Sequence, residues 1–286
     1  MSCDVGIVSF CCFDCLKRCL ESLYRFDQGS FKQILVFENG PVDFPGSLLK
    51  EFPKVRFFKN HKNLGFAKAC NQILEKSSSD YVCFLNPDTE LKAPFLKEAV
   101  GWLEENRQVA VLGPKIVDPD GTVQGSARGF PNIMTSFFGR TSVLTRLLPQ
   151  NPISKKNIKV KPDASLPRRV DWVSGACMVV RKKAVDEVGP LDEGFFMYWE
   201  DCDWCTRFRL RGWKVVYHPA LGPVTHYAGS SSKRTRVKSL YWFHKSAVRL
   251  YCKYDKSPLR LGSVLAVAGG VVRFFIYLPH TILSGR

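Results

Sequence analysis

Apolar and polar positions follow two alternating patterns along the first 115 residues of the chain. Short runs rich in Val and Ile, typical of buried strands, occupy residues 4–10, 33–37, 55–58, 81–85 and 109–113. Between these runs apolar residues recur at helical spacing, as at Leu16, Cys19, Leu20 and Leu23. The alternation predicts a βαβαβ arrangement with a parallel sheet and right-handed crossovers.

Regular periodicity is lost between residues 121 and 169, where Pro, Ser and Lys become frequent. This stretch is predicted to be a long, partly ordered insertion or lid. The patterns then resume, with strands expected at 176–180 and 214–217 and helices at 182–188 and 200–211. Gly212 is placed to end the second of these helices.

The last part of the chain combines positive charge with apolar length. Of the formal net charge of +16, much lies in residues 233–260, which hold nine Lys or Arg and one acid, Asp255. Residues 259–283 are mostly apolar but contain Arg273 and Pro279. Residues 233–286 are therefore predicted to form a basic, amphipathic helical segment that lies on an anionic membrane or packs on the domain, rather than spanning a bilayer. No nucleic-acid-binding motif accompanies the charge, so a nucleic-acid partner is not expected.

Composition and cysteine content favour a cytoplasmic protein. With 286 residues, 45% of them hydrophobic, the chain can form one large domain with an appendage. Eleven cysteines without an evident export signal suggest a reducing compartment. The pairs Cys12/Cys15 and Cys202/Cys205 have Cys-x-x-Cys spacing, but both overlap helical patterns, so a zinc site is not expected.

Two acidic sequences are candidates for chemistry. One, at residues 86–90, follows the strand at 81–85, and the other opens the helix at 200–211 with Glu200, Asp201 and Asp203. Active sites of α/β proteins form beyond the carboxyl ends of strands, so the two sequences can meet in space. The alternatives are a plain turn at 86–89 and simple first-turn acids in the helix, which is the role expected for Asp203.

Phosphate-binding glycine motifs are absent from the sequence, both Gly-x-Gly-x-x-Gly after a strand and Gly-Lys-Ser/Thr. This argues against a dinucleotide oxidoreductase or a P-loop enzyme. A nucleoside diphosphate can instead be held through a divalent metal ion with oxygen ligands, a role that suits Asp88.

Taken in order, the blocks at 6–9, 19–23, 36–40, 63–67, 84–90, 170–176, 200–201, 211–213 and His226 resemble the family 2 glycosyltransferases, in particular the rhamnosyltransferase-like branch. The resemblance runs from about residue 5 to residue 232. It implies an α/β chain with the A-type glycosyltransferase fold, a mostly parallel central sheet flanked by helices. Residues 1–232 would form the glycosyltransferase domain and residues 233–286 the basic, amphipathic C-terminal helical segment.

The resemblance also implies a donor site. Asp88 and His226 would bind Mg²⁺ or Mn²⁺, although a lone histidine is often structural. Ser9, Glu38, Asn39 and Gly65 would form the base and ribose pocket, together with Asn86, which stands where the family more often has Asp. Glu38 likewise replaces a commoner Asp, which leaves the base preference open.

For catalysis, the resemblance makes Asp201 the general base of an inverting transfer and Glu200 a residue that orients the acceptor. Trp172 and Trp199 would stack on an acceptor sugar, or else form part of the core. The implied donor is dTDP-rhamnose or a UDP-sugar. The implied acceptor is a saccharide or polyprenyl-diphosphate-linked saccharide, used for cell-surface polysaccharide at the inner face of the membrane. The alternative is a catalytically inactive, membrane-associated binding protein that retains the fold.

Overall fold

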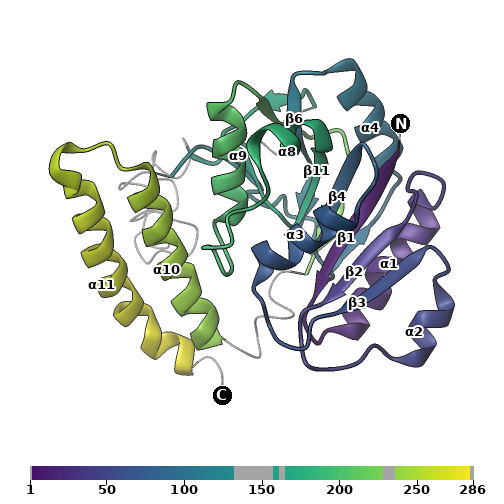
Figure 1. The fold of residues 1–286 in the computed structure, drawn as a ribbon, viewed down its shortest axis with the longest axis horizontal. Coiled ribbons are helices and arrows are strands. Elements are labelled where there is room, and N and C mark those ends of the chain that lie inside the picture. Colours follow the sequence, from purple (N-terminus) through teal and green to yellow (C-terminus); the bar gives the residue numbers. More distant parts are fainter. Residues whose placement is uncertain (1, 132–156, 161–164, 228–235, 284–286) are drawn as a thin grey trace.

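The computed structural model describes residues 2–131, 157–160, 165–227 and 236–283 (Figure 1). The first half alternates strands and helices in the order β1 (Cys3–Ser9), α1 (Phe13–Asp27), β2 (Ile34–Glu38), α2 (Gly46–Glu51), β3 (Val55–Lys59), α3 (Phe66–Lys76), β4 (Tyr81–Leu85), β5 (Thr89–Leu91), α4 (Leu96–Glu105) and β6 (Val109–Pro114). The strands predicted from apolar runs are all present, with ends that differ from the prediction by one residue at most.

The second half follows as β7 (Ile116–Val117), β8 (Ala127–Arg128), β9 (Arg168–Arg169), β10 (Trp172–Val173), β11 (Cys177–Arg181), α8 (Lys182–Val188), α9 (Glu200–Leu210), β12 (Lys214–His218) and β13 (Val224–His226). Gly212 has φ +88°, which suits its predicted place just after α9. Of the predicted insertion at 121–169, the described parts supply β8 and β9, whereas 132–156 and 161–164 lie outside the described residues.

The central sheet has the strand order β3-β2-β1-β4-β11-β6-β12-β9. Strands β3, β2, β1 and β4 are parallel, as predicted, and β12 is parallel to β6. Strand β11 runs antiparallel between β4 and β6, and β9 runs antiparallel at the edge. The α/β fold class is confirmed, with a mixed sheet.

Helices cover both faces of this sheet because successive strand side chains point to opposite faces. On β1, Ile7 belongs to the apolar cluster that includes α1, α2 and α4. Its neighbour Val8 belongs to the cluster on the other face, with α3, α8 and α9. Each cluster is made of fully or nearly fully buried side chains, so the carboxyl ends of the parallel strands are held by a rigid core.

Two small sheets lie beside the main one. In the first, β13 pairs with β5 and β7, which places His226 opposite Thr89. In the second, β10 pairs with β8, which places Trp172 opposite Arg128. Both pairings join segments that are far apart in the sequence, and both bring predicted site residues toward the sheet.

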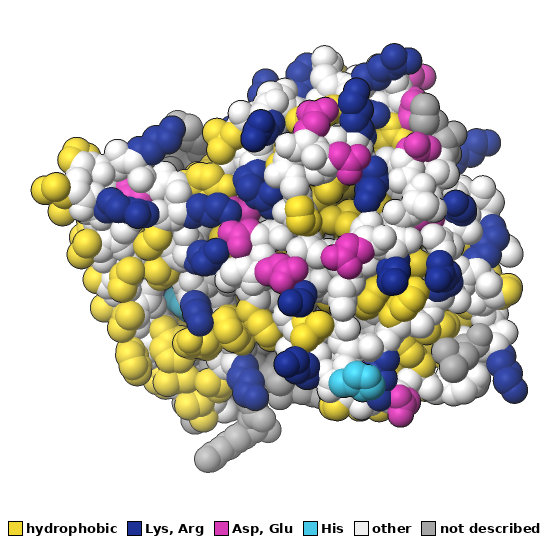
Figure 2. Space-filling model, in the orientation of Figure 1, with side chains coloured by type: hydrophobic (Ala, Val, Ile, Leu, Met, Phe, Trp, Pro, Cys, Tyr) yellow, Lys and Arg dark blue, Asp and Glu magenta, His cyan; other side chains and the backbone are white. Residues whose placement is uncertain are grey.

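Helices α10 (Arg236–Tyr254) and α11 (Leu261–Leu283) form a hairpin at one side of the molecule, with the 3₁₀ turn Pro258–Arg260 between them and α11 outermost (Figure 1). Arg273 and Pro279 both lie within the single helix α11. By length and composition alone, residues Pro258–Pro279 are apolar enough to cross a membrane, and none of this stretch is buried. In Figure 2 hydrophobic side chains gather along this outer edge.

Candidate active site

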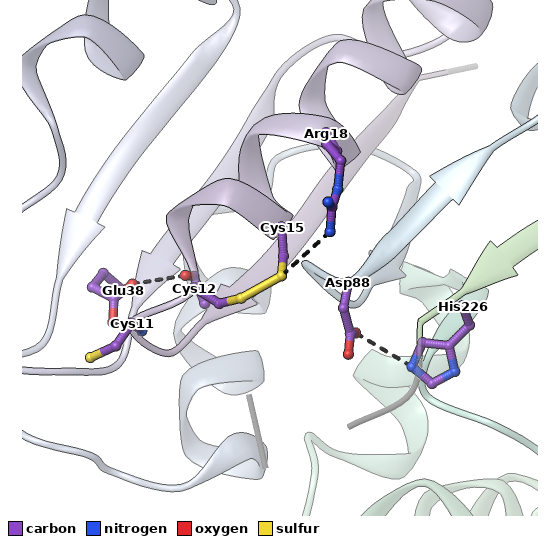
Figure 3. The surroundings of a disulfide bond; sticks show 8 residues. Cys11, Cys12, Cys15, Arg18, Glu38, Asp88 and His226 are labelled. Atoms are coloured by element: carbon purple, nitrogen blue, oxygen red, sulfur yellow. Dashed lines mark hydrogen bonds and ion pairs between the residues drawn. A yellow bond between two sulfur atoms is a disulfide. The ribbon is translucent and has the colours of Figure 1, made fainter. Parts of the chain in front are cut away.

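Glu38 ends strand β2 and is completely buried. One carboxylate oxygen accepts a hydrogen bond from the Ser9 hydroxyl at 2.8 Å, and the other accepts the backbone N–H of Cys11 at 2.9 Å. Figure 3 shows the second of these contacts, at the turn that leads into α1. The predicted pocket residues Ser9 and Glu38 are thus joined directly at the ends of two neighbouring parallel strands.

Asn39 ties the same strand end to the loop before α3. Its side-chain amide donates to the Asn63 side chain at 3.0 Å and to the Gly65 carbonyl at 3.1 Å. Its oxygen accepts the Leu64 N–H at 3.1 Å. Gly65 has φ +89°, and a Cβ there would lie 2.6 Å from the Phe196 carbonyl oxygen, so this position requires glycine. Asn39 and Gly65 therefore belong to one local structure beside Glu38.

His226, at the end of β13, lies beside Asp88, in the turn between β4 and β5. The distance from His226 Nε2 to Asp88 Oδ1 is 3.4 Å (Figure 3). Asn86 Nδ2 lies 3.5 Å from the same ring nitrogen. Asp88 is 7% exposed. The structure therefore brings together the two residues that the sequence assigned to the metal, Asp88 and His226, and Asn86, which was assigned to the base and ribose pocket.

Gln124 fixes the orientation of the His226 ring. Its amide nitrogen donates to Asp118 Oδ1 at 2.7 Å and to the His226 carbonyl at 3.1 Å, so its oxygen, 3.1 Å from His226 Nδ1, acts as the acceptor. Nδ1 then carries the proton, and in the neutral ring the Nε2 lone pair faces the Asp88 carboxylate. A carboxylate oxygen and an imidazole lone pair directed at one point are suited to a shared cation, with Gln124 as the outer partner that orients the ligand.

This pair supplies only part of a coordination shell. Among the parts of the chain that the structure describes, no group of three or more His, Cys, Asp or Glu side chains is arranged to hold a metal ion. Mg²⁺ bound with nucleotides commonly takes one or two protein ligands and completes its shell with phosphate oxygens and water. Asp88 and His226 fit a metal of that kind.

Asp201 lies in the first turn of α9 and is joined to the turn before β11. The Gly175 N–H donates to Asp201 Oδ2 at 2.9 Å, and the next residue, Ala176, accepts the Asn86 N–H at 2.9 Å. The two acidic sequences identified at 86–90 and 200–203 therefore meet on either side of the short segment Gly175–Ala176. This is the arrangement expected for residues beyond the carboxyl end of β4.

Burial raises the pKa of Asp201, while N–H groups of Gly175 and Cys202 and the charge of Arg128 act to lower it. Glu200 is buried more deeply, and one of its carboxyl oxygens has no hydrogen-bond partner. Burial, followed by the charges of Asp201 and Asp203, raises the pKa of Glu200 well above its usual range. Of the two neighbouring carboxyls, Glu200 therefore holds a proton more strongly than Asp201.

Trp172 and Trp199 are both half-buried, with ring centroids 6.1 Å apart. The Trp172 indole N–H donates to the Gly129 carbonyl at 3.0 Å, and the Arg128 guanidinium lies 5.7 Å from its ring. Trp199 directly precedes α9. The two rings are close enough to act on one ligand, and their predicted acceptor role remains a prediction.

Cys12 and Cys15 form a disulfide at the start of α1, close to Glu38 on one side and Arg18 on the other (Figure 3). From the sequence this pair was considered only as a zinc site, and a disulfide was not predicted. The spacing places the two side chains within one helical turn, where they can reach each other. The other nine cysteines are free thiols, and Cys202 and Cys205 are completely buried in α9.

Sequence reasoning missed Gln124, Gly175 and Arg128. Gln124 and Arg128 lie in the stretch that was predicted to be an insertion, where no periodic signal marks single residues. Gly175 acts through its backbone N–H, which carries no side-chain signal. Its position directly before a strand, at the edge where sites form, was the available indication.

Comparison with known proteins assigns the family. The profile described as "Glycosyl transferase family 2" matches residues 4–189. An N-acetylglucosaminyl-diphospho-decaprenol L-rhamnosyltransferase of Mycobacterium tuberculosis (strain CDC 1551 / Oshkosh) is 32% identical over 227 residues, covering 74% of this chain and 72% of the relative. The rhamnosyltransferase WbbL of Escherichia coli (strain K12) is 26% identical over 244 residues, covering 82% of this chain and 87% of the relative.

Solved structures agree in fold. A structure of GalNAc-T7 with UDP, GalNAc and Mn²⁺ has a TM-score of 0.57 at 15% identity and matches 88% of this chain, which spans about half (51%) of that structure. The S. aureus TarS structure has a TM-score of 0.55 at 14% identity, and the match covers 96% of this chain and 44% of the TarS chain. The matched profile and the 32% identical relative together show that this chain belongs to glycosyl transferase family 2, as a nucleotide-sugar-dependent glycosyltransferase.

Proposed function

We propose that the protein transfers L-rhamnose from a nucleotide diphosphate donor, with inversion, to a saccharide carried on a polyprenyl diphosphate. The printed name of the Mycobacterium tuberculosis relative supports both the sugar and the lipid-linked acceptor. The observation that carries the proposal is the connection through Gly175–Ala176, which sets Asp201 beside the Asn86–Asp88 turn. An inverting transfer needs a base and a diphosphate-binding site close to each other, and this connection would bring the two together.

In this reaction Asp201 accepts the proton of the acceptor hydroxyl while the hydroxyl oxygen bonds to the anomeric carbon. The bond from that carbon to the donor phosphate breaks, and the nucleoside diphosphate leaves with the electron pair. Glu200, whose burial favours its protonated form, would orient the acceptor. Attack and departure occur on opposite faces of the sugar, so its configuration inverts and no covalent enzyme intermediate is required.

Asp88 and His226 would hold Mg²⁺ or Mn²⁺ at the diphosphate, and Asn86 lies against the same ring nitrogen. A divalent ion bound there supplies positive charge to the leaving diphosphate. Ser9, Glu38, Asn39 and Gly65 would surround the base and ribose. Both oxygens of the completely buried Glu38 carboxylate already accept hydrogen bonds from Ser9 and Cys11, so its part would be to hold the shape of this pocket. The donors to compare are dTDP-rhamnose and a UDP-sugar.

The protein would work from the cytoplasmic side as a peripheral protein at the inner face of the cell membrane. On α11 the exposed side chains include Val264, Leu265, Phe275 and Ile276, each about 60% exposed. The hairpin partner α10 and the following turn add basic residues, among them Lys245, Arg249 and Lys256. Apolar side chains beside cations are suited to an anionic bilayer surface, which is also where a polyprenyl-linked acceptor resides.

The test is a donor panel. Purified protein with Mg²⁺ or Mn²⁺ and a polyprenyl-diphosphate N-acetylglucosamine acceptor is supplied with dTDP-rhamnose and with several UDP-sugars, and nucleoside diphosphate release is followed. We expect acceptor-dependent release with dTDP-rhamnose, and a product whose anomeric configuration is opposite to that of the donor. Transfer of a different sugar would replace the donor assignment. Failure to release diphosphate from any donor would favour the catalytically inactive binding protein.

A further inference from the structure

The segment leading into α9, residues 192–199 (the entry segment), is held on one side by α10. The hydroxyl of Ser246 donates to the Met197 carbonyl at 2.8 Å. The Phe196 ring stacks on Trp242 with centroids 4.3 Å apart and planes inclined by 21°. These contacts cross the boundary expected between residues 232 and 233, so helix α10 takes part in the structure around the candidate base.

The other side of the entry segment contacts the start of α3. The Phe66 N–H donates to the Phe196 carbonyl at 2.6 Å, beside Gly65. At the end of the segment, Tyr198 and Trp199 both have φ +67°, in the left-handed region. This conformation is unfavourable for residues other than glycine and persists only where the surroundings impose it. The conformation that delivers Glu200 and Asp201 to the site therefore depends on what packs against this segment.

Asp203 is the point where α10 reaches the catalytic helix directly. It is completely buried, two residues after Asp201 in the first turn of α9. Tyr254 donates its hydroxyl hydrogen to Asp203 Oδ1 at 2.8 Å, Lys253 Nζ lies 2.7 Å from the same oxygen, and Arg207 Nε donates to Oδ2 at 2.9 Å. The simple first-turn role expected from the sequence does not account for these two bonds from α10.

Lys253 also binds the beginning of the entry segment. Its ammonium lies 2.7 Å from Asp192 Oδ2, and Arg249 adds contacts of 3.1 Å to both oxygens of that carboxylate. Burial acts to raise the pKa of Asp192, but hydrogen bonds from Lys253, the Gly194 N–H and Arg249 lower it to about 2. One side chain, Lys253, therefore connects Asp192 at one end of the strained segment with Asp203 beyond its other end.

We infer that Lys253 and Tyr254 are positioning residues for the transfer reaction. Through Asp203 they fix the first turn of α9, and thereby the direction in which Asp201 faces the acceptor hydroxyl. The inference rests on the proposed role of Asp201 as the base. It assigns α10 a part in turnover that is separate from the membrane attachment proposed for the hairpin.

The effect on rate follows from geometry. A displacement of about 1 Å at a reacting group lowers the rate on the order of a hundredfold. Donor affinity should be conserved, because Ser9, Glu38, Asn39 and Asp88 are positioned by β1, β2 and β4 rather than by α10. A positioning role therefore predicts a loss in kcat that is not matched by a change in donor KM.

The experiment compares Lys253→Met and Tyr254→Phe with the wild-type full-length chain. Lys253→Arg is the conservative variant, and Lys97→Met, at an exposed lysine of α4 outside the hairpin, is the control. We expect Lys253→Met to lower kcat roughly tenfold to a hundredfold with donor KM within about twofold of wild type. Tyr254→Phe should show a smaller loss in the same direction, Lys253→Arg should retain most of the activity, and the control should equal the wild type.

Amide hydrogen exchange of the free proteins provides a readout that needs no turnover. Exchange in residues 195–204 should be faster in Lys253→Met, while that of α1, on the other face of the sheet, stays unchanged. A kcat within about twofold of wild type overturns the inference, and so does an equal loss of kcat and donor affinity together with faster exchange throughout the domain, which indicates general destabilisation. If the wild-type protein transfers no sugar, the proposed function itself is overturned, and the inference with it, even when exchange changes as expected.

Discussion

The backbone N–H of Gly175 donates a hydrogen bond to Asp201 Oδ2 at 2.9 Å. This contact joins a helix-borne carboxylate to the turn before β11, and the next residue in that turn is bonded to Asn86. The Asn86 bond runs from main chain to main chain, so it should survive substitution of the Asn86 side chain. The Asp201 bond uses the carboxylate itself, so the side chain at position 201 takes part in holding the proposed base beside the Asn86–Asp88 turn.

Replacement of Asp201 by Asn should abolish most of the turnover without loss of donor binding. The amide has nearly the same shape and cannot accept the acceptor proton, and general-base catalysis contributes roughly a hundredfold to ten-thousandfold. Titration with the nucleoside diphosphate should give an unchanged Kd, while kcat falls by that factor. Near-normal transfer by the variant would remove Asp201 from the role of base.

The acidic limb of the pH–rate profile should lie above the usual range for aspartate, about 3.9. Burial raises the pKa of Asp201, so the base becomes protonated, and activity is lost, as the pH falls through this raised value. The charge of Arg128 lowers the pKa of Asp201, so Arg128→Met should move the limb to higher pH. A limb that stays in place in Arg128→Met would show that another group controls it.

Asp88→Ala should weaken nucleoside diphosphate binding strongly in the presence of Mg²⁺ or Mn²⁺ and hardly at all in EDTA, because the lost interaction is mediated by metal. Gln124→Met, which leaves both proposed ligands in place but removes the partner of His226 Nδ1, should weaken metal binding by about tenfold to a hundredfold. Calorimetric titrations with and without metal measure both effects. Wild-type binding that is insensitive to EDTA would contradict the metal assignment of Asp88 and His226.

Binding to lipid vesicles should depend on the outer face of α11. Phe275→Asp and Ile276→Asp place charge on side chains that are 62% and 60% exposed, and should reduce sedimentation with anionic vesicles. Leu166→Asp, at a 73% exposed leucine outside the hairpin, is the control and should have no effect. Added salt should weaken binding of the wild type, since each basic residue near an anionic leaflet contributes on the order of 1 kcal/mol. Equal sedimentation of the wild type with neutral and anionic vesicles would remove the charge contribution from the proposal.

The sequence by itself determined the elements and the general chemistry. Buried strands such as β4 were predicted from continuous apolar runs, and the end of α9 from Gly212, because these signals depend on residues close in the chain. The ordered sequence blocks indicated the family, which the comparisons confirm. The positions of Asp88, His226 and Asp201 in those blocks also named them as site residues.

Only the tertiary structure decided how these parts are joined. The antiparallel insertion of β11 beside β4, the Gln124 contact with His226 and the bonds from Lys253 and Tyr254 to Asp203 all connect residues far apart in sequence. No local pattern specifies such partners, because a lysine on a basic helix reads the same whether it faces solvent or a buried carboxylate. The difference arises when packing removes Asp203 from water, since a buried charge must then find its partners within the protein.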